Sequence, residues 1–343
     1  MKDILAHIER VETGHILAGA EAEAVMEELL SGRMGTPEIV RLLTALNQGP
    51  IQVQELAGFA RVMRRNATRV FADGETRPER MVDTCGTGGD ASNTFNISTA
   101  AAIVAAAAGA RVAKHGNRAA SSQSGSADAL EALGVRIDLP FERYGHAIRE
   151  IGIGFLFAQA AHTATRHAAP ARKQIGVRTI FNLLGPLTNP AGAQSQVLGV
   201  FSAEVIDLVA ATLAELGVEH AFVVHGAGGL DEISISGDTQ VAEVKQGVVR
   251  RFTLTPEEFG VPRAPLESLR GGTAGENAAI IKRILAGEIG PARDIVVINA
   301  AAALAVAGVA PNFREAANLA GGTISSGAAA DKLRALAAFT NGR

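Results

Sequence analysis

The sequence predicts an α/β protein with a small N-terminal helical domain and a larger α/β domain, whose mostly parallel central sheet is flanked by helices. The first seventy residues show helical spacing of apolar residues and contain no run of β-branched residues. The remainder alternates short apolar segments with longer helical ones, which favours a parallel sheet. A length of 343 residues, 47% of them hydrophobic, is sufficient for a large core and more than one domain.

Turn-forming residues delimit the helical part. Thr36 and Pro37 suit the N-cap and first turn of a helix through EIVRLLTALNQ, and Gly49-Pro50 ends it. The next segment, IQVQELAGFARVMRRN, keeps helical spacing until Ala72-Asp73-Gly74. We therefore predict a small domain over residues 1–70, with helices from about 165–185 packing onto it, and a large domain over residues 75–164 and 190–343.

The large domain contains short apolar segments that are typical of strands. In chain order they are RMVDTC, RVAKH, IGFLFA, QVLGVF, HAFVVHG and DIVVINA. Residues 182–190, NLLGPLTNP, carry a glycine and two prolines, so we expect an ordered loop or a crossing between domains. Thr273 and Glu276 have the spacing of a capping box and are expected to be structural.

Charge and composition limit the class of partner. The net charge of −3, with 32 basic and 35 acidic residues mixed along the chain, provides no general attraction for nucleic acid or an anionic membrane. No segment resembles a signal peptide or a continuous membrane span, so we expect a cytoplasmic protein. The single cysteine, Cys85, excludes an internal disulfide and is more typical of a buried structural residue than of a nucleophile.

Two glycine-bearing polar segments enclose an alanine-rich, helix-length spacer. In the first, DTCGTGGDASNTFNIST, the backbone at Gly86, Gly88 and Gly89 has no Cβ and can approach a phosphate closely. The NIST sequence then stands where a helix would begin, and helix N-termini present free amide donors and a positive dipole end. This segment predicts an anion site.

The second segment, KHGNRAASSQSGS, returns cations and donors after that helix and a short apolar stretch. Lys114 and Arg118 supply charge, while Ser121 and Ser122 supply short hydrogen-bond donors. His115 is an isolated imidazole, for which a ligand contact and a structural role are equally open. Together the two segments predict a site for a polyanionic ligand.

Carboxylates accompany this anion site. Asp90 ends the glycine loop, and a carboxylate beside a phosphate indicates a sugar hydroxyl or a Mg²⁺ ion. Asp231 and Glu232 end HGAGGLDE, which follows a predicted strand where active sites of parallel sheets normally lie. Mg²⁺ favours one or two carboxylates together with phosphate oxygens and waters. HExxH, CxxC and the Walker pattern are absent, which argues against a P-loop hydrolase.

Taken in order, GTGGD, NIST, KHGNRAASS, GVRTIFNLLGPLTNP and GLDE resemble the anthranilate phosphoribosyltransferase family over essentially the whole chain. Single motifs also occur in nucleoside phosphorylases, but the full set with this spacing is specific. The resemblance implies a homodimer that binds phosphoribosyl diphosphate and two Mg²⁺ ions. It also implies the reaction, in which the amino group of anthranilate displaces pyrophosphate from C1 of the ribose. This is the second step of tryptophan biosynthesis from chorismate.

The resemblance assigns residues to each ligand. The phosphoribosyl diphosphate contacts fall on Gly86, Gly89, Asp90, Thr94, Asn96, Ile97, Ser98, Thr99, Lys114, His115, Gly116, Asn117, Arg118, Ala119, Ala120, Ser121, Ser122 and Ser126. The magnesium contacts fall on Ser98, Asp231 and Glu232. The anthranilate contacts fall on Gly86, Asn117, His162 and Arg172. No general base is assigned, and Lys114 and Asp90 are expected to act electrostatically.

The chain departs from the family pattern near the expected acceptor site. The family often shows HPAM, whereas His162 is followed here by Thr163, Ala164 and Thr165, and Gln159 replaces a common proline. These changes border the expected anthranilate channel.

Two other functions remain open from the sequence. A pyrimidine nucleoside phosphorylase shares the broad fold and a glycine-rich phosphate loop, although KHGNR joined to GVRTIFNLLGPLTNP favours the transferase. A non-catalytic relative that binds nucleic acid would need a basic surface, which the net charge of −3 does not favour.

Overall fold

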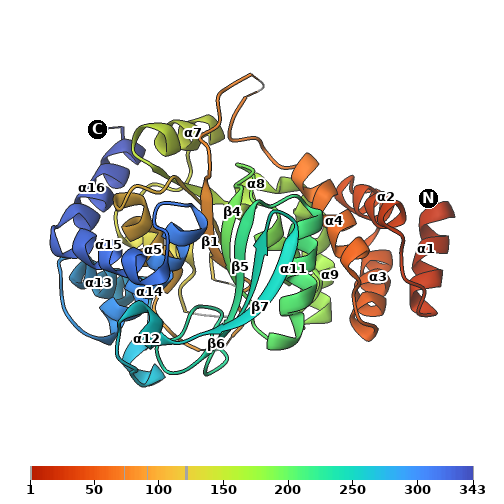
Figure 1. The fold of residues 1–343 in the computed structure, drawn as a ribbon. Helices are drawn as coiled ribbons and strands as arrows, with labels where there is room; N and C mark the ends of the chain where they lie inside the picture. The colour runs from red at the N-terminus through yellow and green to blue at the C-terminus, as the bar shows by residue number, and fades with distance from the viewer. Residues whose placement is uncertain (1, 73, 91, 120–122, 343) are drawn as a thin grey trace.

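The computed structural model describes residues 2–72, 74–90, 92–119 and 123–342. Its N-terminal helices form a separate bundle at one side of the molecule, coloured red to orange in Figure 1. They are α1 (Lys2–Glu12), α2 (Gly19–Leu30), α3 (Thr36–Gln48) and α4 (Val53–Arg65). Helix α2 packs on α4 and α1 packs on α3, so their apolar faces share one core. This arrangement confirms the predicted helical domain.

The start of α3 differs slightly from the prediction. Gly35 is the N-cap, and Thr36 is the first helical residue. A Cβ at residue 35 would lie 2.6 Å from the Glu38 carboxylate, so glycine lets that carboxylate approach the positive end of the helix. Pro37 lies in the first turn and Gly49 is the C-cap, as expected.

The large domain is built on a seven-stranded sheet with the order β3-β2-β1-β4-β5-β6-β7. Its strands are β1 (Val82–Gly86), β2 (Val112–Gly116), β3 (Ile153–Phe157), β4 (Ser195–Gly199), β5 (His220–Gly226), β6 (Thr239–Lys245) and β7 (Val248–Leu254). The first five strands pair in parallel, whereas β6 and β7 pair antiparallel. The prediction of a mostly parallel sheet is confirmed.

One predicted strand is wrong. DIVVINA lies inside helix α14 (Pro291–Val306). All residues from Ile295 to Leu304 are buried, so this helix has no polar face and its sequence shows no helical periodicity. The prediction also omitted β6 and β7. Strand β7 exposes its first four residues at the sheet edge.

Helices cover both faces of the sheet (Figure 1). On one face α5 packs against α14 and α16, and alanines at the α5–α14 contact allow close approach. On the other face α11 lies between the sheet and α4. The remaining helices are α5 (Ile97–Ala107), α6 (Ser126–Ala132), α7 (Phe141–Glu150), α8 (Ala158–Ala161), α9 (Ala169–Ile175), α10 (Phe181–Leu184), α11 (Ile206–Glu215), α12 (Pro256–Phe259), α13 (Ala274–Leu285), α15 (Phe313–Ser325) and α16 (Ala328–Thr340), with 3₁₀ turns η1 (Thr163–Ala168), η2 (Gly185–Leu187), η3 (Ala203–Val205) and η4 (Leu266–Leu269).

The predicted crossing, residues 182–190, contains the end of α10, then η2, then irregular chain. Just before it, η1 contacts α2 and α9 contacts α3. The bounds of the two domains stay a prediction.

The capping box at α13 is present, since the Thr273 N–H donates to Glu276 Oε2 at 2.7 Å and the Glu276 N–H donates to Thr273 Oγ1 at 3.4 Å. Within the described ranges, no helix has the length and apolarity needed to cross a membrane.

Candidate active site

The two predicted polar segments and the carboxylate pair meet at the carboxyl edge of the parallel strands. The glycine loop follows β1, and the Gly88 N–H donates to Asp231 Oδ2 at 2.8 Å. Helix α5 begins close by, and the Ser98 N–H donates to Glu232 Oε1 at 3.0 Å. The segment after β5 therefore contacts both the glycine loop and the helix start of the first polar segment, although it lies more than 130 residues further along the chain.

Glycines allow this close approach. Gly88 and Gly89 have φ values of +66° and +75°, which a residue with a Cβ adopts only with strain. At Gly86 a Cβ would overlap the Asp231 carboxylate, and at Gly199, on β4, it would overlap the Asp231 backbone. The backbone of these glycines therefore approaches Asp231 closely, and the predicted approach to a phosphate stays a prediction.

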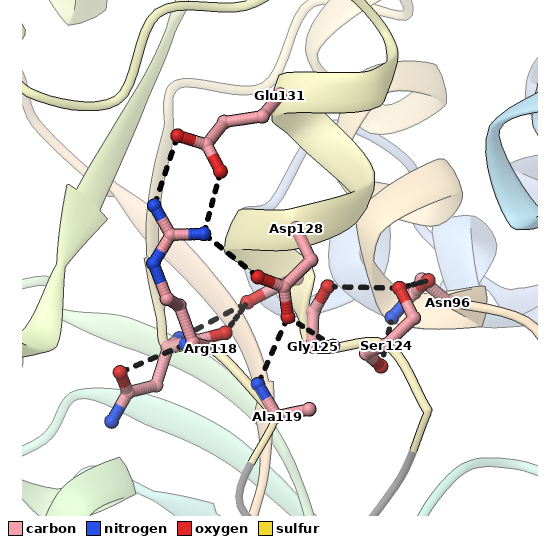
Figure 2. Close-up of polar contacts among 9 residues, drawn as sticks. Asn96, Arg118, Ala119, Ser124, Gly125, Asp128 and Glu131 are labelled. Carbon is pink, nitrogen blue, oxygen red and sulfur yellow. Dashed lines mark hydrogen bonds and ion pairs between the residues drawn. The ribbon is translucent and has the colours of Figure 1, made fainter. Parts of the chain in front are cut away.

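Helix α5 begins at the NIST sequence, as predicted. Asn96 is its N-cap, but the Asn96 side chain makes no capping bond. Its Nδ2 donates to the Ser124 carbonyl at 3.1 Å, and its Oδ1 accepts from Ser124 Oγ at 3.2 Å (Figure 2). Thr94 forms an isolated bridge with Arg270. The side chains of Ile97 and Thr99 are buried, so Ile97 offers a ligand only its backbone.

Lys114 lies between β1 and the start of α5. Its side chain is buried, and its Nζ donates to the Thr84 carbonyl at 2.5 Å and to Ser98 Oγ at 3.3 Å. Burial lowers the pKa of Lys114, and the negative charge of Asp83 opposes this effect. The ammonium group is thus held at the predicted anion site.

Asp83 is a polar residue of this region that sequence reasoning missed. It is 0% exposed, and burial raises its pKa to about 6. Its Oδ1 accepts from the His115 N–H at 2.9 Å and its Oδ2 from Asn189 Nδ2 at 2.8 Å. Asn189 Nδ2 also contacts the Ala113 carbonyl at 2.8 Å, so Asp83 joins β1, β2 and the crossing segment. The signal for Asp83 that the sequence offered was a carboxylate inside the apolar strand RMVDTC.

Asp231 and Glu232 form a half-buried pair of neighbouring carboxylates. Burial raises the pKa of Asp231 to about 7, with a further contribution from Asp90, and raises that of Glu232 to about 8, with a further contribution from Asp231. The Asp231 N–H also lies 3.5 Å from Asp90 Oδ2. The negative charges of these carboxylates repel one another, which is unfavourable unless a cation lies nearby.

A Mg²⁺ ion fits this donor set. The described ranges contain no cluster of three or more His, Cys, Asp and Glu side chains arranged for a metal ion. Mg²⁺ commonly uses only one or two carboxylates and takes its other oxygens from phosphates and waters. Asp231, Glu232 and the Ser98 hydroxyl are hard oxygen donors of this kind, and the Glu232 carboxylate accepts from the Ser98 N–H at the start of α5.

The second polar segment folds onto helix α6. The Asn117 N–H donates to Ser126 Oγ at 3.1 Å. At Gly116 a Cβ would overlap the Ser126 hydroxyl and the Phe155 ring. The guanidinium of Arg118 pairs with carboxylates of α6 (Figure 2), and Ala119 lies beside them. The predicted contacts Ala120, Ser121 and Ser122 lie outside the described residues.

Among the predicted acceptor residues, His162 packs against His115, which the resemblance assigns to the phosphoribosyl donor. The rings of His115 and His162 meet edge to face with centroids 5.3 Å apart, and His162 Nε2 lies 3.4 Å from Thr188 Oγ1. His115 Nε2 is buried with no hydrogen-bond partner in the described structure. Arg172 is exposed and lies over the Phe181 ring at 5.3 Å, and within the described part of the chain it forms no hydrogen bond or ion pair with the other predicted acceptor residues.

The residues that depart from the family pattern flank His162. Gln159 and Thr163 are exposed, and Thr165 Oγ1 donates to the His162 carbonyl at 2.7 Å.

Cys85 Sγ accepts from Gln196 Nε2 at 3.0 Å, and burial raises the pKa of its thiol well above the usual value. A neutral thiol is a poor nucleophile, which agrees with the structural role predicted for Cys85.

The two histidines give the protein a pH-dependent stability. Burial and the neighbouring His162 lower the pKa of His115 to about 3, and burial lowers that of His162 to about 4. Unfolded histidine titrates near ~6.5, so below that pH the unfolded chain binds protons that the folded chain does not. The stabilisation is complete above the unfolded pKa and is lost as the pH falls toward the folded values.

We therefore expect the free energy of unfolding to fall by about 2 kcal/mol for each of these histidines between pH 7 and pH 5. Urea unfolding at both pH values measures the effect, and His115→Gln should lack its share. His146→Gln, at an exposed position on α7, is the control and should keep the wild-type dependence. The same pH dependence in wild type and His115→Gln would contradict the prediction.

Comparisons with known proteins place this geometry in a family. Residues 6–67 match the model of the glycosyl transferase family helical bundle domain, and residues 78–330 match that of the family's a/b domain. An anthranilate phosphoribosyltransferase from Pelotomaculum thermopropionicum is 52% identical over 97% of this chain and 95% of that protein.

Solved structures agree with the sequence relatives. The anthranilate phosphoribosyltransferase of Thermus thermophilus aligns with a TM-score of 0.91 and 46% identity over 97% of this chain and 99% of that one. The Saccharomyces cerevisiae enzyme in complex with PRPP and Mg aligns with a TM-score of 0.89 and 27% identity over 100% and 99% of the two chains. The chain belongs to the anthranilate phosphoribosyltransferase family, within the glycosyl transferases that combine a helical bundle with an α/β domain.

Proposed function

We propose that this protein transfers the phosphoribosyl group of 5-phosphoribosyl 1-diphosphate to the amino group of anthranilate. The products are N-(5-phosphoribosyl)anthranilate and pyrophosphate, in the second step of tryptophan biosynthesis. The observation that carries the proposal is the meeting of Lys114, the start of α5 and the pair Asp231 and Glu232 at one edge of the sheet. A relative with this fold has been solved with PRPP and Mg, the ligands that such a site suits.

The chemistry asks for stabilisation of a leaving pyrophosphate and of an oxocarbenium-like ribose. Lys114 supplies a fixed positive charge beside Ser98, and the N-terminus of α5 adds the positive end of its dipole. Magnesium, when bound with the diphosphate, supplies further neutralisation of the growing negative charge. Asp90 borders the same loop and is suited to accept from a ribose hydroxyl.

The acceptor needs little activation. The amino group of anthranilate is already neutral, so orientation should contribute more than proton abstraction. His115 and His162 are held neutral by burial and form an aromatic wall beside the end of β2. The exposed guanidinium of Arg172 is suited to pair with the acceptor carboxylate.

A direct assay tests the function. The protein is mixed with phosphoribosyl diphosphate, Mg²⁺ and anthranilate, and the loss of anthranilate fluorescence is followed, with nicotinate and uracil as control acceptors. We expect consumption of anthranilate alone. Phosphorolysis of thymidine or uridine, without loss of anthranilate, would instead identify a nucleoside phosphorylase.

Arg172→Ala should raise the KM for anthranilate about tenfold or more, because it removes a charged hydrogen-bond partner. The KM for phosphoribosyl diphosphate should change little. Steady-state kinetics with each substrate varied in turn measures the two constants. Lys173→Ala, which removes the neighbouring exposed cation on α9, is the control. An equal rise in both KM values would contradict the role given to Arg172.

The proposal also includes two Mg²⁺ ions, a homodimer and a cytoplasmic location. Two phosphate groups on one ligand offer oxygens for more than one ion, which supports the number. Calorimetric titration of Mg²⁺ in the presence of phosphoribosyl diphosphate counts the ions. Light scattering of the purified protein measures the oligomeric state.

A further inference from the structure

Asp128 makes more contacts than helix capping requires. It is the third residue of α6, and its Oδ2 accepts from the Gly125 N–H at 2.9 Å, which is the ordinary contact of an acidic residue at this position. The same oxygen also accepts from the Ala119 N–H at 3.0 Å, nine residues back along the chain (Figure 2). One carboxylate oxygen thus binds two stretches of backbone together.

The other oxygen of Asp128 fixes a side chain. Its Oδ1 accepts from Arg118 Nη1 at 2.8 Å. Glu131, one turn further along α6, accepts from Nη1 at 2.6 Å and from Nη2 at 2.9 Å. The guanidinium of Arg118 therefore lies against α6, held by two carboxylates (Figure 2), although its sequence motif predicts a phosphate contact.

The backbone around this carboxylate is packed closely. A Cβ at Gly125 would overlap the backbone of residues 117–119. The Ala127 N–H donates to the Asn117 carbonyl at 3.1 Å, and the Asn117 N–H donates to Ser126 Oγ at 3.1 Å. Residues 117–119 are consequently fixed directly after β2, whose Lys114 reaches the proposed magnesium ligand Ser98.

We propose that Asp128 is a positioning residue for the phosphoribosyl donor. Its carboxylate holds the backbone of residues 117–119 at the end of β2, and Arg118 acts as the counter-charge of this carboxylate rather than as a phosphate ligand. The inference rests on the proposed function, because it assigns a task within that donor site. A residue that only capped α6 would need neither the Ala119 N–H nor the Arg118 guanidinium.

Two substitutions separate the contacts of Asp128. Asp128→Ala removes both backbone contacts and the pairing with Arg118, and it should raise the KM for phosphoribosyl diphosphate about tenfold. In Asp128→Asn the amide oxygen can still accept from both backbone N–H groups, so the increase should be clearly smaller. The KM for anthranilate should stay within about twofold in both variants.

The small domain offers a matched control. Glu21 is the third residue of α2, accepts from the Ala18 N–H at 2.8 Å and pairs with Arg10 Nη1 at 2.6 Å. Glu21→Ala removes the same kinds of contact, so it should lower the unfolding midpoint to a similar extent without changing the donor KM. A donor KM raised equally by Glu21→Ala and Asp128→Ala would overturn the inference.

Binding measured without turnover keeps the test independent of the transferase reaction. Calorimetric titration of phosphoribosyl diphosphate with Mg²⁺ gives the donor Kd of wild type, Asp128→Asn and Asp128→Ala. We expect the Kd to rise in that order, and an unchanged Kd in Asp128→Ala overturns the inference. If Asp128→Ala does not fold, a Kd for Asp128→Asn equal to or above ten times the wild-type value overturns the ranking of the contacts. Donor binding without anthranilate turnover would count against the proposed function alone.

Discussion

Asp231→Asn combined with Glu232→Gln is expected to lower kcat/KM about a thousandfold. The substitution keeps the size of both side chains but removes the two negative charges that a Mg²⁺ ion would need. It also weakens the hydrogen bonds that these carboxylates accept from Gly88 and Ser98. Burial raises the pKa of both carboxylates, with repulsion from Asp90 acting on Asp231 and repulsion from Asp231 acting on Glu232. Neutral side chains avoid the cost of these buried charges, so the variant should unfold at the same temperature as wild type or a higher one.

Turnover as a function of Mg²⁺ concentration, together with the thermal unfolding midpoint, measures this prediction. Glu257→Gln with Glu258→Gln is the control, because it neutralises another pair of adjacent acidic residues, on α12. That control should keep wild-type turnover and Mg²⁺ response. Wild-type activity in the Asp231 and Glu232 double variant would refute the metal assignment.

Asp83→Ala should lower the free energy of unfolding by about 3–5 kcal/mol, since it breaks a buried charge interaction by removing one partner. The variant leaves the buried ammonium of Lys114 without its nearby negative charge. It also leaves the His115 N–H without an acceptor and removes one of the two acceptors of the Asn189 amide. The loss should therefore exceed that of an ordinary surface substitution.

Urea unfolding followed by circular dichroism gives this free energy. Asp138→Ala is the control, because Asp138 also pairs with an arginine, Arg136 at 2.6 Å, but is exposed. Surface pairs contribute about 1 kcal/mol or less, so the control should remain close to wild type. Similar losses for the two variants would show that burial of Asp83 is not what makes it important.

The fold was predictable wherever one element has a local signal. Strands β1 to β5 are short apolar segments bounded by turn residues, and α3 has a proline in its first turn and a glycine at its end. Helix α14 has no such signal, because it is buried on all sides and its β-branched run DIVVINA is compatible with either a strand or a helix. Its environment, in contact with α5 and α15, decides the outcome.

The candidate site, like the fold, was predictable where its residues have a local signal in the sequence. The glycine loop, the start of α5 and the pair Asp231 and Glu232 each stand out locally, and the structure brings them together. The contacts of Asp83 and Asp128 depend on partners far along the chain, such as Asn189, or on the exact path of a loop. Spacing in the sequence does not carry that information, because it arises only when the chain has folded.

Neighbouring residues on strand β2 point to opposite faces of the sheet, and this alternation separates the contacts of Lys114 from those of His115. Lys114 reaches Ser98 on one face, whereas the ring of His115 meets His162 on the other. A substitution of His162 would therefore leave the contacts of Lys114 in place. A one-residue deletion within β2, by contrast, would exchange the faces to which the two side chains point and would disrupt both sets of contacts at once.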